Sequence, residues 1–317
     1  MNSKVMLMAA FAVCACANLE QEIVPESGEM VELSFRIPGH SQTKVSGTLV
    51  EDKVNDLQVF VFGQDGQLHA YGHSKSDEVT MTCSTGEKHI AALVNAPALD
   101  SVSDEATLKE LVSSFSDNST ENFVMTGIED MTIDKTGEVV IPVERLVSKV
   151  LLKSVTNDFS FVQHQSMDLE IKSIFLTNAA TDRKYLSDSS PSGWYNKDIS
   201  DMSQIIEQSG DMMYDSFEPV TIEYGTTYES GRYLYCYPNP LDDGMDPTYL
   251  VVEAVLEGVV YYYPVALPEM ESNKCYSVSL TLCRPGSSTP DVPVEKQDVS
   301  FSVEVKPWTY VSVSDKI

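Results

Sequence analysis

The feature that most constrains the fold is a period of two in the apolar residues. Residues 29–37, EMVELSFRI, alternate apolar and polar side chains, which is typical of a β-strand with one buried face. The inward positions of this strand would be Val31, Leu33, Phe35 and Ile37. Residues 299–305 alternate in the same way, and residues 57–62 are almost entirely apolar, which indicates a strand buried on both faces. The chain therefore reads as a β protein.

Short strands dominate the rest of the chain as well. The best predicted helix covers residues 101–115, and residues 202–208 are a second, shorter candidate. Residues 181–231 otherwise read as mostly irregular. Many short strands with one or two short helices predict mostly-β sandwich domains. A chain of 317 residues suggests about two domains, and we place their boundary near residue 146.

The first residues, MNSKVMLMAAFAVCACANLEQEI, have the pattern of an export signal. A basic start is followed by the apolar stretch 5–13, which is about half of what a helix needs to cross a bilayer. Cys16 has an apolar residue three positions before it and Ala15 just before it, which fits a bacterial lipobox better than Cys14 does. We expect a signal peptide over 1–15, a lipid on Cys16 and a tether over 16–29. The alternative is an ordinary signal peptide with incidental cysteines.

The charge excludes one class of partner. The chain has 48 acidic and 21 basic residues and a net charge of −27, so it repels nucleic acid. Four internal cysteines in an exported protein could form disulfides, but their spacing has no CxxC pair that would suggest zinc. These cysteines are Cys83, Cys236, Cys275 and Cys283.

Motifs that carry chemistry are weak in this sequence. His69 and His73 would lie roughly 13 Å apart on a strand, too far to share one ion, and we read them as solvated loop residues. The acidic turn 242–246 lacks the ligand ladder of a calcium loop. We therefore expect no metal site, no cofactor and no enzymatic activity. The tyrosines at 233, 235, 237 and 261–263 could form a glycan platform, although strands also use tyrosine in ordinary packing.

An ordered set of segments resembles the fimbrillins of the Bacteroidales, the lipoprotein-derived pilins called type V. The set begins with the lipobox and continues with LVEDKVNDLQVFVFGQDGQL, CSTGEKHIAALVNAP and VERLVSKVLLKSV. It ends with a YYP strand, an N-K-x-Y strand, a Gly-Ser loop with spaced prolines, and the late Trp308.

This resemblance implies two transthyretin-like Greek-key β-sandwich domains, residues 30–145 and 146–317. It also implies a structural pilus subunit that reaches the outer membrane as a lipoprotein and supports adhesion. A trypsin-like protease would cut beyond the first strand, and the C-terminal strand of another subunit would replace that strand. We expect the cut after Lys44, with Arg36 as the alternative; the family usually has arginine at this site. The inward residues of the donor tail would be Val311, Val313 and Ile317, with Asp315 the odd member of the row.

The expected partners are other pilin subunits, in a homopolymer or a mixed pilus, the maturation protease, and the outer membrane through the lipid on Cys16. The precursor would be an outer-membrane lipoprotein and the product a cell-surface fimbrium. A host or glycan ligand stays open, as does a shaft, tip or anchor role. The alternative function is a non-polymerising outer-membrane surface lipoprotein, namely an anchor, a tip or a glycan-binding adhesin.

Overall fold

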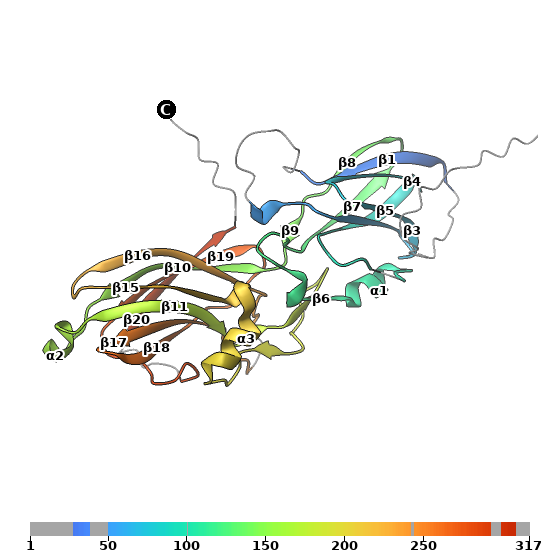
Figure 1. Cartoon of the computed structure of the whole chain (residues 1–317). Coiled ribbons are helices and arrows are strands. Elements are labelled where there is room, and N and C mark those ends of the chain that lie inside the picture. The colour runs from blue at the N-terminus through green and yellow to red at the C-terminus, as the bar shows by residue number, and fades with distance from the viewer. Residues whose placement is uncertain (1–27, 39–49, 100, 242–243, 293–298, 309–317) are drawn as a thin grey trace, which may run out of the picture.

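The computed structural model describes residues 28–38, 50–99, 101–241, 244–292 and 299–308, and it shows two β-sandwiches that meet at a junction (Figure 1). Most of the elements are strands, so the mostly-β prediction is confirmed. Within the described ranges, no helix has the length and apolar character needed to cross a membrane.

The N-terminal sandwich packs a three-stranded sheet against a five-stranded sheet. In the smaller sheet, β1 (Met30–Arg36) lies between the antiparallel β4 (Glu78–Ser84) and the parallel β8 (Gly137–Val140). The larger sheet has the order β3-β2-β5-β7-β9. Its strands are β2 (Leu57–Gly63), β3 (Leu68–Ser74), β5 (Gly86–Val94), β7 (Met125–Ile133) and β9 (Glu144–Arg145). The middle strand of the smaller sheet is thus the first strand of the chain.

The alternating residues of β1 and the residue after it form part of the core between these two sheets. Val31, Leu33, Phe35 and Ile37 are at most 7% exposed and belong to one hydrophobic cluster. The other members include Leu57, Val59, Val61, Val79, Cys83, Ile90, Ala92, Val94, Val139 and Ile141. The period of two therefore places these side chains as the sequence predicted.

The C-terminal sandwich is built from two four-stranded sheets. One has the order β16-β10-β19-β20 and the other β15-β11-β17-β18. The strands of the first are β10 (Ser148–Asn157), β16 (Thr227–Cys236), β19 (Lys274–Leu282) and β20 (Val299–Pro307). Those of the second are β11 (Leu169–Thr177), β15 (Tyr214–Thr221), β17 (Tyr249–Leu256) and β18 (Val259–Ala266). β20 is an edge strand, and the chain beyond it lies outside the described residues from position 309.

Helices and short ladders make up the remaining elements. The helices are α1 (Glu105–Glu110), α2 (Val162–Gln165), α3 (Met202–Met213) and the 3-10 turns η1 (Val50–Asp52) and η2 (Phe115–Asp117). The short strands are β6 (Val112–Ser114), β12 (Ala179–Ala180), β13 (Asp182–Lys184) and β14 (Trp194–Tyr195). β6 pairs with β13, so a strand from the N-terminal half joins one from the C-terminal half.

Two local predictions are wrong. The helix predicted over 101–115 begins at residue 105, where Asp104 caps it, and ends at residue 110. It gives way to β6 because Val112–Ser114 find a distant partner in β13, which outweighs local helix propensity. The stretch 181–231 is not mostly irregular, since it contains α3, β15 and part of β16. The helix predicted at 202–208 exists and is longer than expected.

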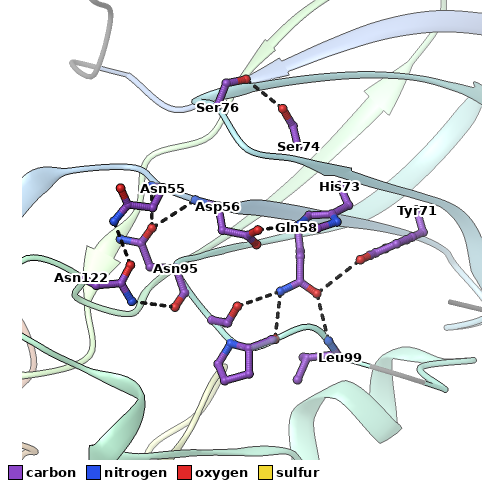
Figure 2. A network of polar contacts seen from close by, with 12 residues as sticks. Asn55, Asp56, Gln58, Tyr71, His73, Ser74, Ser76, Asn95, Leu99 and Asn122 are labelled. Carbon is purple, nitrogen blue, oxygen red and sulfur yellow. Dashed lines mark hydrogen bonds and ion pairs between the residues drawn. The ribbon is translucent and has the colours of Figure 1, made fainter. Parts of the chain in front are cut away.

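A polar network fastens the segment between η1 and β2 (Figure 2). Asn95 has φ 58°, in the left-handed region, where Asn is tolerated. Its side-chain oxygen accepts the N–H groups of Asn55 and Asp56, at 2.8 and 3.3 Å. Its side-chain nitrogen donates to the carbonyls of Lys53 and Phe123, at 2.7 and 3.0 Å. One buried side chain therefore holds residues 53–56 in place.

Candidate functional site

β1 is fixed by backbone ladders on both of its edges. All of Met30–Arg36 is in register with Ser84–Glu78 on β4, and residues 33–36 are in parallel register with residues 137–140 on β8. The ladders are extended at both ends, since the Thr85 N–H donates to the Glu29 carbonyl and the Ile141 N–H donates to the Arg36 carbonyl, each at 2.9 Å. β1 is therefore a central strand although it lies at the start of the chain.

β4 and β8 both depend on β1. Among the described strands, β1 is the only ladder partner of each, and Val79 on β4 and Val139 on β8 are buried in the shared core. Loss of β1 would leave unpaired backbone on both β4 and β8 and an apolar trough between them. An unpaired edge of this kind pairs readily with another strand. The geometry is that of a strand-binding groove that the chain itself fills.

Some of the predicted site residues lie in the groove, and others lie outside the described residues. Val31, Leu33, Phe35 and Ile37 lie together in the groove. Arg36 lies within the ladder, faces away from the core and pairs with Glu138 at 3.4 Å. Cys16, Lys44, Val311, Val313 and Ile317 lie outside the described residues.

A second polar site lies where the sandwiches meet, and we call it the junction cluster: Glu51, Asp52, Arg145, Lys149, Tyr235 and Trp308. Glu51 accepts Lys149 Nζ at 2.7 Å and Trp308 Nε1 at 3.2 Å. It also accepts a hydrogen bond from the Tyr235 hydroxyl. The η1 turn, in the chain just after residues 39–49, is thereby bound to β10, β16 and the residue that follows β20.

Asp52 and Arg145 form the buried ion pair of the junction cluster. Asp52 is 3% and Arg145 6% exposed. The Arg145 guanidinium also donates to the Asn273 side chain at 2.9 Å and lies 4.3 Å from the Trp308 ring centroid, in a cation–π arrangement. Trp308 in turn stacks on Tyr235 with 5.5 Å between centroids. A buried pair this well bonded is costly to break, because loss of one partner leaves an uncompensated charge.

The electrostatics of the junction cluster follow from its contacts. Burial alone would raise the pKa of Glu51, but its bonds to Lys149, Tyr235 and Trp308 outweigh burial and hold the pKa below its usual value of 4.5. Burial and the adjacent Glu51 carboxylate raise the pKa of Tyr235 well above its usual value. Glu51 is thus held as a carboxylate and Tyr235 as a neutral donor at neutral pH. The contacts of the junction cluster hold its charged groups in fixed positions, and none of its side chains is an activated nucleophile.

The histidine interpretation needs correction. His69 and His73 lie on β3 rather than in a loop; His69 is buried, whereas His73 is exposed as expected. His69 is 7% exposed, and its Nδ1 lies 3.0 Å from Lys88 Nζ, whereas His73 Nε2 lies 2.6 Å from an Asp56 carboxylate oxygen. Within the described parts of the chain, no group of three or more potential ligands is placed to hold a metal ion.

The tyrosines do not form one exposed platform. Tyr235, Tyr237 and Tyr263 are at most 2% exposed, and Tyr262 is 8% exposed. Tyr233 is the most exposed of the row at 46%, and it carries Lys149 Nζ 4.0 Å from its ring centroid. These rings serve mainly as packing.

The four internal cysteines are free thiols. Cys83 and Cys236 are buried, whereas Cys275 and Cys283 are partly exposed. Burial raises the pKa of the Cys236 thiol to about 12, so this thiol is unreactive.

Sequence reasoning missed the junction cluster and the buried Lys88. Glu51 and Asp52 stand in the polar run VEDKVND, which reads as a solvated turn. A signal was nevertheless present, because a late Trp308 and an isolated Arg145 beside apolar residues are side chains that seek partners when buried. Nothing in one sequence shows that residues 51, 145 and 308 meet.

Comparisons with known proteins agree with this architecture. Residues 32–147 match the family model described as Major fimbrial subunit protein (FimA). No curated protein sequence matches the chain at a significant level.

Solved structures share the fold over nearly the whole chain. A candidate cell adhesion protein from Parabacteroides distasonis ATCC 8503 has 17% identity and a TM-score of 0.65 over 89% of this chain and 97% of that one. A candidate cell adhesion protein from Bacteroides eggerthii DSM 20697 has 18% identity and a TM-score of 0.65 over 91% and 98%. A fimbrilin from Porphyromonas gingivalis W83 has 17% identity and a TM-score of 0.63 over 89% and 98%.

At these identities the likeness to solved structures establishes the two-sandwich fold, and the family match covers residues 32–147 alone. The matched residues contain nearly all of β1 and the two strands that flank it. Residues 32–147 are therefore similar to major fimbrial subunit proteins, and the chain as a whole shares the fold of a solved fimbrilin and of solved candidate cell adhesion proteins.

Proposed function

We propose that this chain is a subunit of a cell-surface pilus, made as a lipoprotein precursor and assembled by exchange of β1 for the C-terminal tail of another subunit. The observation that carries the proposal is the position of β1. It lies in the middle of a sheet, with its inward side chains in the core. Its only covalent connection to the rest of the sandwich nevertheless runs through residues 39–49. One cut in that segment makes the strand a separate, replaceable peptide.

Lys44 suits the cut better than Arg36 does. Arg36 is held in ladders with Glu78 and Val140, so a protease could reach its peptide bond only after the end of β1 had unfolded. Cleavage there would also leave Ile37, a fully buried member of the core, behind on the processed chain. Cleavage after Lys44 frees all four inward side chains together.

Contacts in the structure support the proposal that the chain after the cut stays attached to the N-terminal sandwich. Glu51 and Asp52 are bonded into the junction cluster, and residues 53–56 are fastened through Asn95 (Figure 2). A chain beginning at Val45 would therefore be anchored from its seventh residue, Glu51, onward. The cut separates β1 from a sandwich that is otherwise held together.

The free energy available in the groove is substantial. Burying four large apolar side chains contributes roughly 1.5–3 kcal/mol each, or about 6–12 kcal/mol before entropy, and this is an upper estimate. An added strand would recover part of that energy through its own apolar face and through backbone bonds to β4 and β8. In the tail, Val311, Val313 and Ile317 supply such a face. The empty groove is unfavourable, so exchange with a tail is favoured over release alone.

The precursor side of the proposal rests on the first residues. Residues 1–15 act as the signal peptide, Cys16 carries the lipid that anchors the precursor in the outer membrane, and residues 16–29 tether β1 to it. A trypsin-like protease releases this segment, and other pilin subunits are the partners in the fimbrium. We place the domain boundary near residue 146, between domains 30–145 and 146–317, and we infer a role in adhesion.

The test is to nick the chain from residue 17 onward with limiting trypsin, then read the new N-terminus, the size in solution and the particles under negative stain. The proposal predicts a terminus at Val45 and growing filaments. Lys44→Gln should resist this cut, whereas Arg36→Gln should be cut as before. A clean cut after which the protein remains a monomer would contradict polymerisation. That result would favour an anchor, a tip or a glycan-binding surface lipoprotein.

A further inference from the structure

The N-terminal sandwich contains a buried lysine that the strand-exchange scheme does not explain. Lys88 on β5 is 2% exposed, and no other lysine in the described ranges is buried. Its ammonium group donates to His69 Nδ1 at 3.0 Å and to Ser84 Oγ at 3.2 Å. His69 Nε2 lies 3.6 Å from an Asp65 carboxylate oxygen. Lysine is rarely buried without a polar role.

Lys88 lies at one end of the groove that β1 occupies. On β5 it shares the inward face with Ile90, Ala92 and Val94, because β5 has no register break. Its partner Ser84 stands opposite Met30 on β1, and Cys83, the next residue along β4, stands opposite Val31. Burial raises the pKa of the Cys83 thiol, and the Lys88 charge partly offsets that effect, which is consistent with their proximity. The groove therefore has a cationic end at the level of Val31.

The proposed donor tail carries one acidic residue on its inward face. In TYVSVSDKI, residues 309–317, the alternation that turns Val311, Val313 and Ile317 inward turns Asp315 inward as well. A carboxylate placed against an apolar wall would cost several kcal/mol unless it were paired. The tail therefore needs a cation at one position in the groove.

The possible registers differ in where they put Asp315. A tail parallel to β1 with Val311 at the level of Val31 would place Asp315 at the level of Phe35, which is fully buried. An antiparallel tail with Ile317 at the level of Val31 would place Asp315 at the level of Leu33, which is 3% exposed. Each of these registers buries an unpaired carboxylate.

A parallel tail shifted so that Asp315 reaches the level of Ile37 also places the carboxylate unfavourably. At that end of the groove the Ile37 N–H donates to the Asp77 carbonyl, so another acidic residue stands at the same level. The register that places Asp315 at the level of Val31 and still keeps both Val313 and Val311 inside the groove is antiparallel to β1. Val313 and Val311 then occupy the levels of Leu33 and Phe35, and the carboxylate meets Lys88.

We infer that Lys88 is the specificity-determining residue of the groove, which pairs with Asp315 of the incoming tail and fixes its direction and register. This inference rests on the proposed strand exchange and deepens it. The partner is the tail of a second copy of this chain, or of another subunit with an acidic residue at the same inward position. Before the exchange, Lys88 remains bonded to His69 and Ser84.

The test measures binding of labelled peptides to the nicked subunit as β1 is displaced. The probes are the peptide of residues 309–317 and the same peptide with Asp315→Asn. We expect the Asn peptide to bind about 10- to 100-fold more weakly, which is the usual worth of a hydrogen bond to a charged group. Equal binding of the two peptides would overturn the pairing and leave strand exchange standing. If neither peptide binds, strand exchange itself fails and the pairing fails with it.

A variant of the subunit separates pairing from packing. Lys88→Met should reduce the difference between the two peptides to less than about 3-fold, because the partner of the carboxylate is gone. Lys135→Met, at an exposed position between β7 and β8, should preserve the full difference. A full Asp preference in the Lys88→Met protein would overturn the assignment. The comparison of peptides on the wild-type protein holds even where this variant folds poorly.

The natural Cys83 reports the direction of the bound tail through disulfide formation. Because it stands opposite Val31, a tail peptide with Asp315→Cys should form a disulfide with Cys83 in the inferred register. A peptide with Val311→Cys should not, since position 311 would lie at the level of Phe35. Mass mapping of the cross-linked products decides between the two. Preferential capture of the Val311→Cys peptide would show a parallel tail and contradict the inference.

Discussion

In the proposed scheme Phe35→Ala separates the precursor from the exchanged subunit, because residue 35 would leave with β1. Phe35 is fully buried in the core of the N-terminal sandwich. Truncation of a buried phenylalanine costs about 3–5 kcal/mol through lost burial and the cavity that remains. We expect the precursor to lose stability by this amount, seen as a lower urea midpoint and faster hydrogen exchange in β4 and β8. The exchanged form should be as stable as wild type.

The matched control is Leu57→Ala, which removes a fully buried side chain of the same core from β2. Because β2 would remain after the proposed cut, this change should destabilise both forms by about 2–5 kcal/mol. The processed form is made by nicking each protein and adding excess tail peptide. A Phe35→Ala defect that persists after β1 has been displaced would refute the reasoning, as would a precursor that tolerates the change.

Three further substitutions test the junction cluster, the close packing at Gly127 and the buried hydroxyl of Tyr237. Glu51→Gln should make the free energy of unfolding depend less on pH in acid. Because the pKa of Glu51 is lowered in the folded state, its carboxylate stabilises the fold above pH 4.5, and this stabilisation is lost as the pH falls through the folded pKa. Urea midpoints across pH 3–7 measure the change in stability. Gly127→Ala should cost about 1–3 kcal/mol in thermal unfolding, since its new Cβ would lie 2.0 Å from the Pro142 carbonyl oxygen. Tyr237→Phe should cost about 1–3 kcal/mol, because the buried hydroxyl that donates to Ser113 Oγ at 2.7 Å is lost; an unchanged melting temperature would contradict this role.

Local pattern was enough to predict the element at the centre of the account. The alternation from Val31 to Ile37 specifies which side chains are buried, because a strand of fixed period has only two faces. Its central place in the sheet was not readable, since β4 and β8 are distant in sequence and pairing is a property of the folded chain. The sequence-based resemblance supplied the idea that this strand is replaceable.

Non-local contacts explain the failures. Val112–Ser114 have a plausible helical pattern and become β6 only because β13 offers a ladder. Glu51 resembles any surface acid until Lys149 and Trp308 surround it. Lys88 interrupts an apolar strand in a way that pattern reading assigns to a strand end, whereas the fold buries it beside Ser84 and His69.

The most direct test of the central claim is to lock β1 in the groove reversibly. Val31→Cys places a second thiol opposite the free Cys83, and antiparallel partners lie about 4.5–5.5 Å apart at Cα, within reach of a disulfide. The measurement is filament formation after nicking, with and without reductant. The account predicts that the oxidised variant is cut yet remains monomeric, and that it assembles once the disulfide is reduced. Filaments from the oxidised, cut protein would show that β1 need not leave, and would contradict the account.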